Sequence, residues 1–144
     1  MASTVFPAAS AASKTMFRVP LTSGTSYTVP TGALYLNVKT FGGGQGGNAA
    51  GNGYSGQDGN TGQVIASTLS STPGNSIAYT IGAGGTSSAG AGGNTTFTGA
   101  TTATGGSAAG PTGEGADNGG RGAQSGVTAS SAGGSGKIEI EYWA

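Results

Sequence analysis

Glycine recurs at every third residue along the middle of this chain. Of the chain's 32 glycines, all except Gly24 and Gly32 lie between Gly42 and Gly136. The first part of that stretch keeps a fixed register, formed by Gly44, Gly47, Gly53, Gly56, Gly59 and Gly62, with Ala50 in the remaining place. Three residues is the period of the left-handed polyproline II helix, where glycine on one edge lets two backbones approach closely. The register therefore predicts packed, extended tracts and disfavours a flexible linker.

The tracts define the expected domain organisation. We predict an N-terminal arm at residues 1–14 that contacts an assembly partner, and a single glycine-rich β domain at residues 15–144. Within this domain, the glycine-rich tracts occupy about residues 42–62, 82–93 and 105–136. At a rise of ~3.1 Å per residue, an unbroken run from Gly44 to Gly62 would extend roughly 55 Å, longer than a small domain. The chain is therefore expected to reverse near residues 48–52.

Between the tracts, apolar residues alternate as they do in β-strands. Strands are predicted at residues 16–19, 27–29, 33–41, 63–69, 77–81 and 137–143, with a weaker one at residues 94–104. In the third of these, Leu34, Leu36 and Val38 share one face. No segment has helical spacing. The expected fold is all-β, a small β-sandwich-like framework with polyproline or polyglycine II tracts between strands and no helix.

Enzymatic chemistry is poorly supported by the residues present. The chain has no histidine and no cysteine, so a serine or threonine nucleophile lacks its usual base. Glu139 and Glu141 share a strand face, where we expect them to be solvated. Three separated carboxylates, those of Asp58, Glu114 and Asp117, are the candidates for holding a cation, but we expect them to be solubilising loop residues. We therefore predict no enzymatic activity, no cofactor and no metal.

Charge and hydropathy exclude two classes of partner. Five basic and five acidic residues balance and are scattered along the chain, so neither nucleic acid nor an anionic membrane is an expected partner. No apolar run is long enough for a membrane span, so membrane insertion is not expected, and the first residues lack the pattern of a signal peptide.

The order of motifs resembles a known family. The segment from Tyr27 to Val38, followed by Phe41-Gly42-Gly43-Gly44, resembles the opening of the glycine-rich domain of phage tail-fibre and related virion proteins. The matching later pieces are Thr72-Pro73-Gly74, Ile81-Gly82-Ala83-Gly84-Gly85, Gly92 to Phe97, Ala103 to Gly106, and Gly133 to Gly136. The resemblance covers about residues 25–143. More loosely, the chain resembles the tip adhesins of T-even phage long tail fibres, but it is shorter and has β segments at both ends.

That looser resemblance implies a polyglycine II sandwich whose loops contact a bacterial receptor. The candidate receptor-binding residues are the large or polar ones that interrupt the tracts: Asn52, Tyr54, Gln57, Asp58, Asn60, Asn118, Arg121 and Gln124. An aromatic ring beside amides and carboxylates suits saccharide or protein-loop recognition. In the competing interpretation, Tyr54 caps the glycine layer, and Arg121 pairs internally with Glu114 or Asp117.

Apolar residues near the two ends of the sequence indicate assembly. Val5, Phe6 and Trp143 are candidate assembly contacts, and a homo-oligomer is expected, with a trimer or another symmetric form as the hypothesis.

The expected function is that of a non-enzymatic bacteriophage structural protein, made in the host cytoplasm and displayed on the virion surface. The favoured role is a tail-fibre tip or receptor-binding protein. Its expected partners are other virion proteins, in the fibre shaft or capsid, and a bacterial surface receptor, either a glycan or an outer-membrane protein. The alternatives are a head-decoration protein and, as a lesser alternative, a glycine-rich surface or ice-binding protein.

Overall fold

The computed structural model describes residues 13–48, 58–107 and 130–144, which form strands and contain no helix. The strands are β1 (Met16–Leu21), β2 (Ser26–Thr28), β3 (Tyr35–Phe41), β4 (Val64–Ser70), β5 (Ser76–Thr80), β6 (Thr96–Phe97) and β7 (Lys137–Trp143). The prediction of an all-β fold is therefore confirmed.

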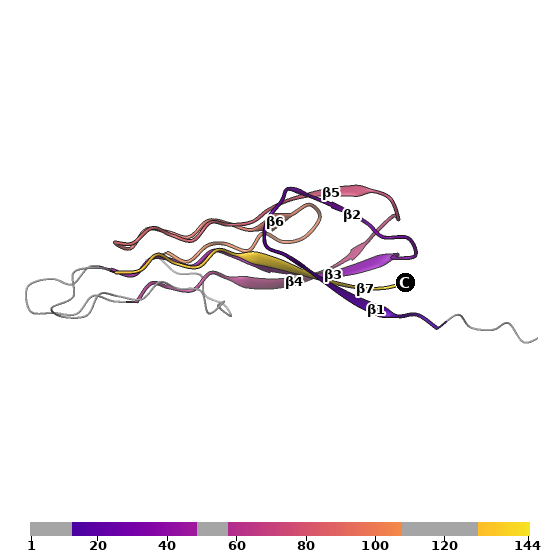
Figure 1. Ribbon diagram of the computed structural model, residues 1–144, viewed down its shortest axis with the longest axis horizontal. Helices are drawn as coiled ribbons and strands as arrows, with labels where there is room; N and C mark the ends of the chain where they lie inside the picture. The colour runs from indigo at the N-terminus through magenta and orange to yellow at the C-terminus, as the bar shows by residue number, and fades with distance from the viewer. Residues whose placement is uncertain (1–12, 49–57, 108–129) are drawn as a thin grey trace, which may run out of the picture.

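The strands form two antiparallel sheets. The larger sheet has the order β1-β7-β3-β4, and the smaller sheet has the order β2-β5-β6. Both lie at one end of the elongated molecule, and the glycine tracts run out from them toward the other end (Figure 1). Residues from both sheets meet in one core, so the two sheets pack as a small sandwich.

Alternation along the strands places the core side chains. Leu36 and Val38 of β3 and Ile138 and Ile140 of β7 are fully buried against Tyr27, Tyr79 and Phe97 of the smaller sheet. In β7 the intervening Lys137, Glu139 and Glu141 lie on the opposite, outer face, as the sequence predicted. Leu34 departs from the prediction, because it precedes β3 and remains 52% exposed.

The predicted strand at residues 94–104 is mostly wrong. Only Thr96–Phe97 form a strand there, and a single bridge joins Thr95 to Ala103 across the intervening turn. Gly99 in that turn has a φ of +91°, which a threonine-rich strand does not accommodate. Phe97 is nevertheless buried, so the apolar residue that suggested the strand does reach the core.

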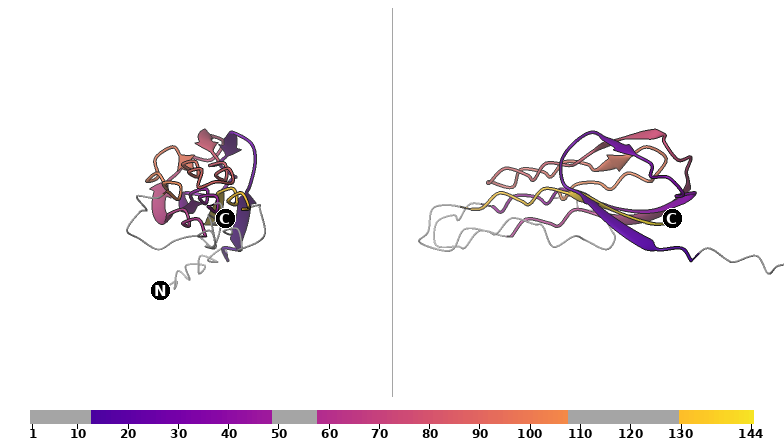
Figure 2. Two further views of the ribbon diagram at one scale, coloured as in Figure 1. Left: turned by 90° about the vertical axis from the view of Figure 1, so that its left-hand side faces the viewer. Right: turned by 45° about the vertical axis from the view of Figure 1, so that its right-hand side comes forward.

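Each glycine tract continues a strand or the bridge in the adjoining sheet. Residues 42–47 follow β3, 58–63 precede β4, 82–86 follow β5, 90–94 precede β6, 103–107 follow the bridge, and 130–136 precede β7. The tract at residues 42–47 is buried along its whole length. The other tracts surround it, as the view along the molecule shows (Figure 2, left).

We call the tract at residues 42–47 the central tract. The hydrogen bonds that its N–H groups donate repeat with a period of three. The N–H groups of Gly42 and Gln45 donate to Gln63 and Asn60 in the tract at residues 58–63. Those of Gly43 and Gly46 donate to Gly93 and Gly90, and those of Gly44 and Gly47 donate to Gly134 and Ser131, all at 2.8–2.9 Å. Successive residues therefore point to three different neighbours, which is the behaviour of a three-residue helix without internal hydrogen bonds.

The remaining neighbours donate to the central tract or bond to one another. Gly106 donates to the carbonyl oxygen of Gly43, and Gly85 donates to that of Gly44. Outer tracts are joined through Gln63 to Thr104, Gly92 to Gly106, Gly93 to Ala83, and Gly133 to Gly85. The described tracts thus form a polyglycine II-like bundle around residues 42–47.

Hydrogen bonds between two of the tracts also confirm the prediction that the chain reverses its direction. Gly42 bonds to Gln63 while Gln45 bonds to Asn60, so residues 42–47 and 58–63 run in opposite directions. The chain therefore reverses between Asn48 and Asp58. Residues 49–57, where the break at Ala50 falls, lie outside the described residues.

Glycine is required in the bundle because of space, not because of unusual dihedral angles. The described glycines with positive φ are Gly24, Gly32, Gly74 and Gly99, and all of them lie outside the tracts. A Cβ atom on Gly62 or Gly92 would instead lie far inside van der Waals distance of a carbonyl oxygen of the central tract. Backbone must move to make room for any side chain at such positions.

Substitution of Gly92 by alanine tests this close packing. The added methyl group would overlap the Gly43 carbonyl, so we expect a loss of unfolding free energy of about 3 kcal/mol. The control, Ala91→Ser, adds one heavy atom at the exposed neighbouring position and is expected to change stability by no more than ~0.5 kcal/mol. Chemical denaturation of both variants measures the difference, and equal stabilities would contradict the bundle.

The buried Tyr27 hydroxyl predicts a dependence of stability on alkaline pH. It has no hydrogen-bond partner among the described residues, and burial, assisted by nearby Tyr142, raises its pKa from 10.0 to about 12. In the unfolded chain this tyrosine ionises near pH 10, whereas the folded protein keeps it protonated. Its contribution to stability is therefore complete below pH 10 and is lost as the pH rises toward 12.

We expect Tyr27→Phe to reduce the loss of unfolding free energy between pH 10 and pH 12, without destabilising the protein at pH 7. Denaturation at a series of pH values provides the measurement. Tyr35→Phe is the matched control, because Tyr35 is 64% exposed. Identical pH profiles for the Tyr27 variant and the wild type would contradict this assignment.

Candidate functional site

The structure describes only part of the predicted site. Asp58, Asn60 and Trp143 are among the described residues. The other predicted contacts lie outside them: Val5, Phe6, Asn52, Tyr54, Gln57, Asn118, Arg121 and Gln124, together with the alternative ion-pair partners Glu114 and Asp117. Asp58 and Asn60 lie close together in one tract, whereas Trp143 lies in the sandwich at the opposite end of the molecule.

Asp58 and Asn60 border a polar hollow at the far end of the bundle, which we call the tract end. The hollow has a volume of about 200 Å³ and is lined by Gln45, Gly46, Asn48, Asp58, Gly59, Asn60 and Ala89. The side-chain amide of Asn60 donates from Nδ2 to the carbonyl oxygen of Ser107 at 2.7 Å. This bond ties the tract at residues 58–63 to the tract at residues 103–107.

Gln45 is the one described residue of the central tract that carries a side chain. That side chain is buried, and its Nε2 donates to the carbonyl oxygen of Ala89 at 3.2 Å. Its Oε1 accepts from the backbone N–H of Asn60 at 3.1 Å. Gln45 therefore joins the tract at residues 58–63 to the turn that contains Ala89, and it forms part of the wall of the hollow.

The sequence interpretation missed Gln45 and Asn48. Gln45 carries a readable signal, because it alone interrupts the run Gly42-Gly43-Gly44-Gln45-Gly46-Gly47. A polar side chain within a run of glycines is unusual, and if buried it needs hydrogen-bond partners. Asn48 is the first exposed residue after this run, but nothing in its local sequence separates it from an ordinary turn asparagine.

The tract end offers amide and carboxylate groups together with backbone polar groups. Such groups can hydrogen-bond a polar ligand such as a sugar or a peptide loop. Among the described residues there is no group of three or more acidic side chains able to hold a metal ion.

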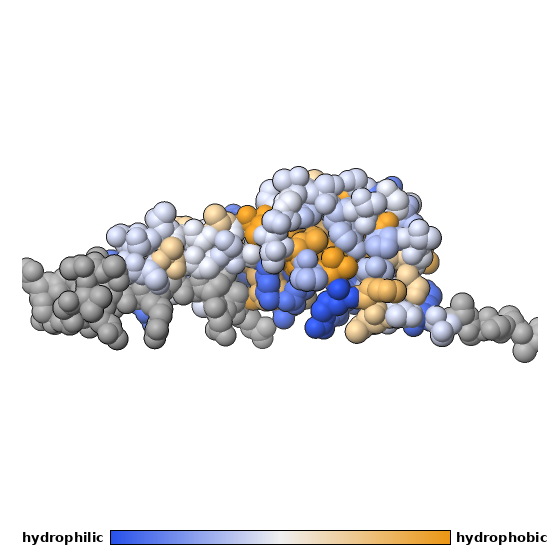
Figure 3. Space-filling view, viewed as in Figure 1, coloured by the Kyte–Doolittle hydropathy of each residue, from blue (hydrophilic) through white to orange (hydrophobic). Residues whose placement is uncertain are grey.

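The outer face of the larger sheet carries paired charges. Arg18 donates from Nε to Glu141 at 2.8 Å and also contacts it through its second nitrogen, while Lys137 bonds to Glu139 at 2.7 Å. The hydrogen bond from Lys137 holds the pKa of Glu139 below its ordinary value. Each of the two carboxylates has a basic partner, and Arg18, Glu139 and Glu141 also border a hollow of about 510 Å³. Figure 3 shows strongly hydrophilic and strongly hydrophobic residues over the sandwich, whereas the visible surface of the tracts lies near the middle of the hydropathy scale.

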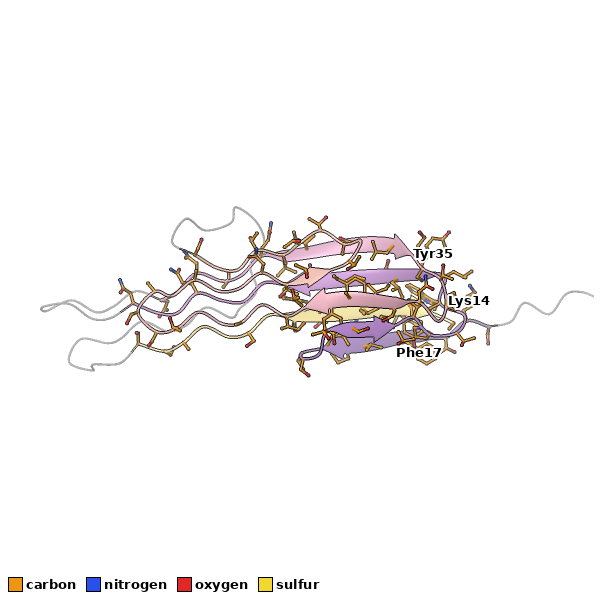
Figure 4. The ribbon with its side chains drawn as sticks, turned by 90° about the horizontal axis from the view of Figure 1, so that it is seen from above. Lys14, Phe17 and Tyr35 are labelled. Atoms are coloured by element: carbon orange, nitrogen blue, oxygen red, sulfur yellow. The ribbon has the colours of Figure 1, made fainter. Side chains whose placement is uncertain are left out.

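Exposed large apolar side chains gather at the other end of the molecule. Among the described residues they are Met16, Phe17, Leu34, Tyr35 and Trp143, which are 43–64% exposed. Met16 pairs with Trp143, and continuing the β3–β7 register by two residues brings Tyr35 beside Trp143. Figure 4 shows Phe17 and Tyr35 at this end, beside Lys14 and opposite the tracts. We call this group the aromatic end.

Both ends of the described chain also meet at the aromatic end. Thr15 and Ala144 exchange backbone hydrogen bonds of 2.9 and 3.1 Å. Phe17 stacks on Tyr142 with ring centroids 5.2 Å apart, which fixes the start of β1 against β7. The two ends of the described structure therefore differ: exposed apolar side chains lie beside residues 15 and 144, and the polar hollow lies at the tract end.

These features define a class of non-helical protein in which a small β-sandwich anchors a bundle of glycine tracts. The chain belongs to the glycine-rich domain family, whose model matches residues 21–141. A comparison with curated proteins finds no match. No helix in the described ranges is long and apolar enough to cross a membrane.

Removal of the Gln45 side chain tests its role at the tract end. Gln45→Ala would leave the Ala89 carbonyl oxygen without this donor, and we expect a destabilisation of about 2 kcal/mol. We also expect faster hydrogen exchange at the Asn60 amide. Gln63→Ala is the matched control, because Gln63 is only partly buried and its side-chain contacts are exposed. A larger effect at Gln63 than at Gln45 would overturn this assignment.

Proposed function

We propose that this protein is a non-enzymatic bacteriophage structural protein that binds the bacterial surface from the tip of a tail fibre. The observation that carries the proposal is the separation of the two ends. The tract end presents polar groups around a hollow in the hydrogen-bonded bundle, and the aromatic end presents apolar side chains beside residues 15 and 144. Such a layout suits a module that is attached at one end and contacts a ligand at the other.

Rigidity of the bundle supports recognition at the tract end. Backbone hydrogen bonds hold the tracts on several sides, so the described residues that line the hollow lie on a fixed support. Binding residues on loops that are positioned by a rigid scaffold are common in recognition proteins. Asp58 and Asn60 occupy this place among the described residues, together with Gln45 and Asn48.

The aromatic end supports attachment to a larger particle. The strand registers bring the exposed side chains of Met16, Trp143 and Tyr35 together on one face, and exposed apolar patches mark interaction surfaces. Aromatic residues and methionine, which make up most of this group, are also the types enriched at protein interfaces. The proposed partner at this end is another virion protein of the fibre, and the bacterial receptor, a glycan or an outer-membrane protein, is the partner at the other.

Adsorption of purified, fluorescently labelled protein to a panel of bacteria tests the proposal. We expect saturable binding to some cells and inhibition of phage adsorption. A double variant at the tract end, Asp58→Ala with Asn60→Ala, is expected to bind cells roughly tenfold or more weakly. Tyr35→Ser at the aromatic end is the control, and it is expected to keep cell binding while weakening attachment to virion proteins.

Two outcomes would overturn the tail-fibre assignment. One is a folded protein that binds none of the cells, and the other is cell binding that depends on Tyr35 and not on the tract end. Binding of many copies to phage heads in the same assay would instead support a head-decoration role.

A further inference from the structure

The two edges of the larger sheet are built differently. At the β1 edge, Thr15 and Ala144 form a hydrogen-bonded pair, so alternation along the ladder directs the backbone groups of Met16, Arg18 and Pro20 outward. Pro20 has no N–H, and Arg18 adds a charge that is paired with Glu141. Proline and charge are the devices that prevent an edge strand from pairing with another chain.

The β4 edge has a full row of outward backbone groups. Hydrogen bonds from Ser71 to Leu34 and from Gly42 to Gln63 flank the β3–β4 ladder and set its alternation. The residues that bond to β3 are therefore Ile65, Ser67 and Leu69. Val64, Ala66, Thr68 and Ser70 direct their N–H and C=O groups away from the sheet, where no described strand pairs with them.

Side chains on β4 do not protect this edge. The strand Val-Ile-Ala-Ser-Thr-Leu-Ser contains no proline and no charged residue. Ala66, Thr68 and Ser70, whose backbones face outward, also have small, exposed side chains on the outer face. The inner face is covered, since the backbone N–H of Thr101 donates to the hydroxyl of Ser67. Among the described residues, β4 is thus covered on its inner face and exposed on its outer face and along its edge, and its β-branched residues favour an extended conformation.

We propose that β4 pairs in antiparallel orientation with β4 of a second copy of this chain, about a twofold axis near Ser67. In that register Ala66 lies opposite Thr68 of the second copy and Val64 lies opposite Ser70, so every outward-facing residue of both strands gains a partner. Because β4 is uncharged, the symmetric pairing brings no like charges together. The β1 edge of a second copy fits less well, because Pro20 lacks a donor and Arg18 brings a charge.

The pairing joins the two larger sheets into one continuous sheet and does not use the tract end or the aromatic end. In such a dimer the two bundles point in opposite directions, because the paired strands are antiparallel. The proposed pairing therefore does not depend on receptor binding, and the oligomeric state of the protein tests it.

Sedimentation equilibrium of the wild type and of β4 variants tests the pairing. We expect a concentration-dependent dimer for the wild type. Ala66→Pro removes an outward N–H and leaves the β3–β4 ladder intact, as Pro20 does naturally at the other edge, so dimer dissociation is expected to become about tenfold or more easier. The matched control Ala66→Ser keeps the N–H and is expected to dimerise like the wild type.

A second variant keeps the test valid if Ala66→Pro fails to fold. Thr68→Lys places a positive charge on each copy near the axis, and we expect weaker dimerisation that recovers partly at high salt. Hydrogen exchange provides an independent readout in the wild type, because the amides of Ala66 and Thr68 are expected to be protected only at concentrations that support the dimer. A wild type that sediments as a monomer, or an oligomer unaffected by either variant, would overturn the proposal.

Discussion

Backbone hydrogen bonding between glycine tracts is the interaction on which this structure depends. An extended three-residue helix has no internal hydrogen bonds, so each N–H and C=O group needs a partner elsewhere. The tract at residues 42–47 finds these partners in neighbours on several sides, and a Cβ atom at Gly42, Gly43 or Gly46 would overlap a neighbouring backbone. The high glycine content is therefore a packing requirement that takes the place of a conventional side-chain core along half of the molecule.

The β-sandwich makes this bundle possible. Glycine has a large conformational entropy in the unfolded chain, so isolated tracts are costly to order. Here each tract continues from a strand or a bridge whose neighbour and direction are already set by the sheets. The apolar core around Leu36, Phe97 and Ile138 stabilises those strands and thereby aligns the tracts. The sandwich end of the molecule supplies the hydrophobic stabilisation, and backbone hydrogen bonds hold the tracts together at the other end.

Much of the fold was predictable from the sequence, because its signals are local. The alternation in β3 and β7 and the triplet register each follow from a short repeat, and the chain reversal follows from the length of the register. Residues 94–104 were harder, because threonine suits a strand while Gly99 imposes a turn that only its φ of +91° reveals. The strand order and the central place of residues 42–47 depend on contacts between distant segments. The candidate site was predictable only in part. Asp58 and Asn60 were named from the sequence and line the hollow at the tract end. The linking role of Gln45 is recognised only once its hydrogen-bond partners, Ala89 and Asn60, are known.

The most direct test of the central claim is hydrogen exchange, measured by NMR, at the amides of residues 42–47. These groups are buried and bonded to other tracts at 2.8–2.9 Å, so the account predicts exchange as slow as that of the β3 and β7 amides. Exchange at the rate of an unfolded chain, in a sample whose sheet amides remain protected, would contradict it.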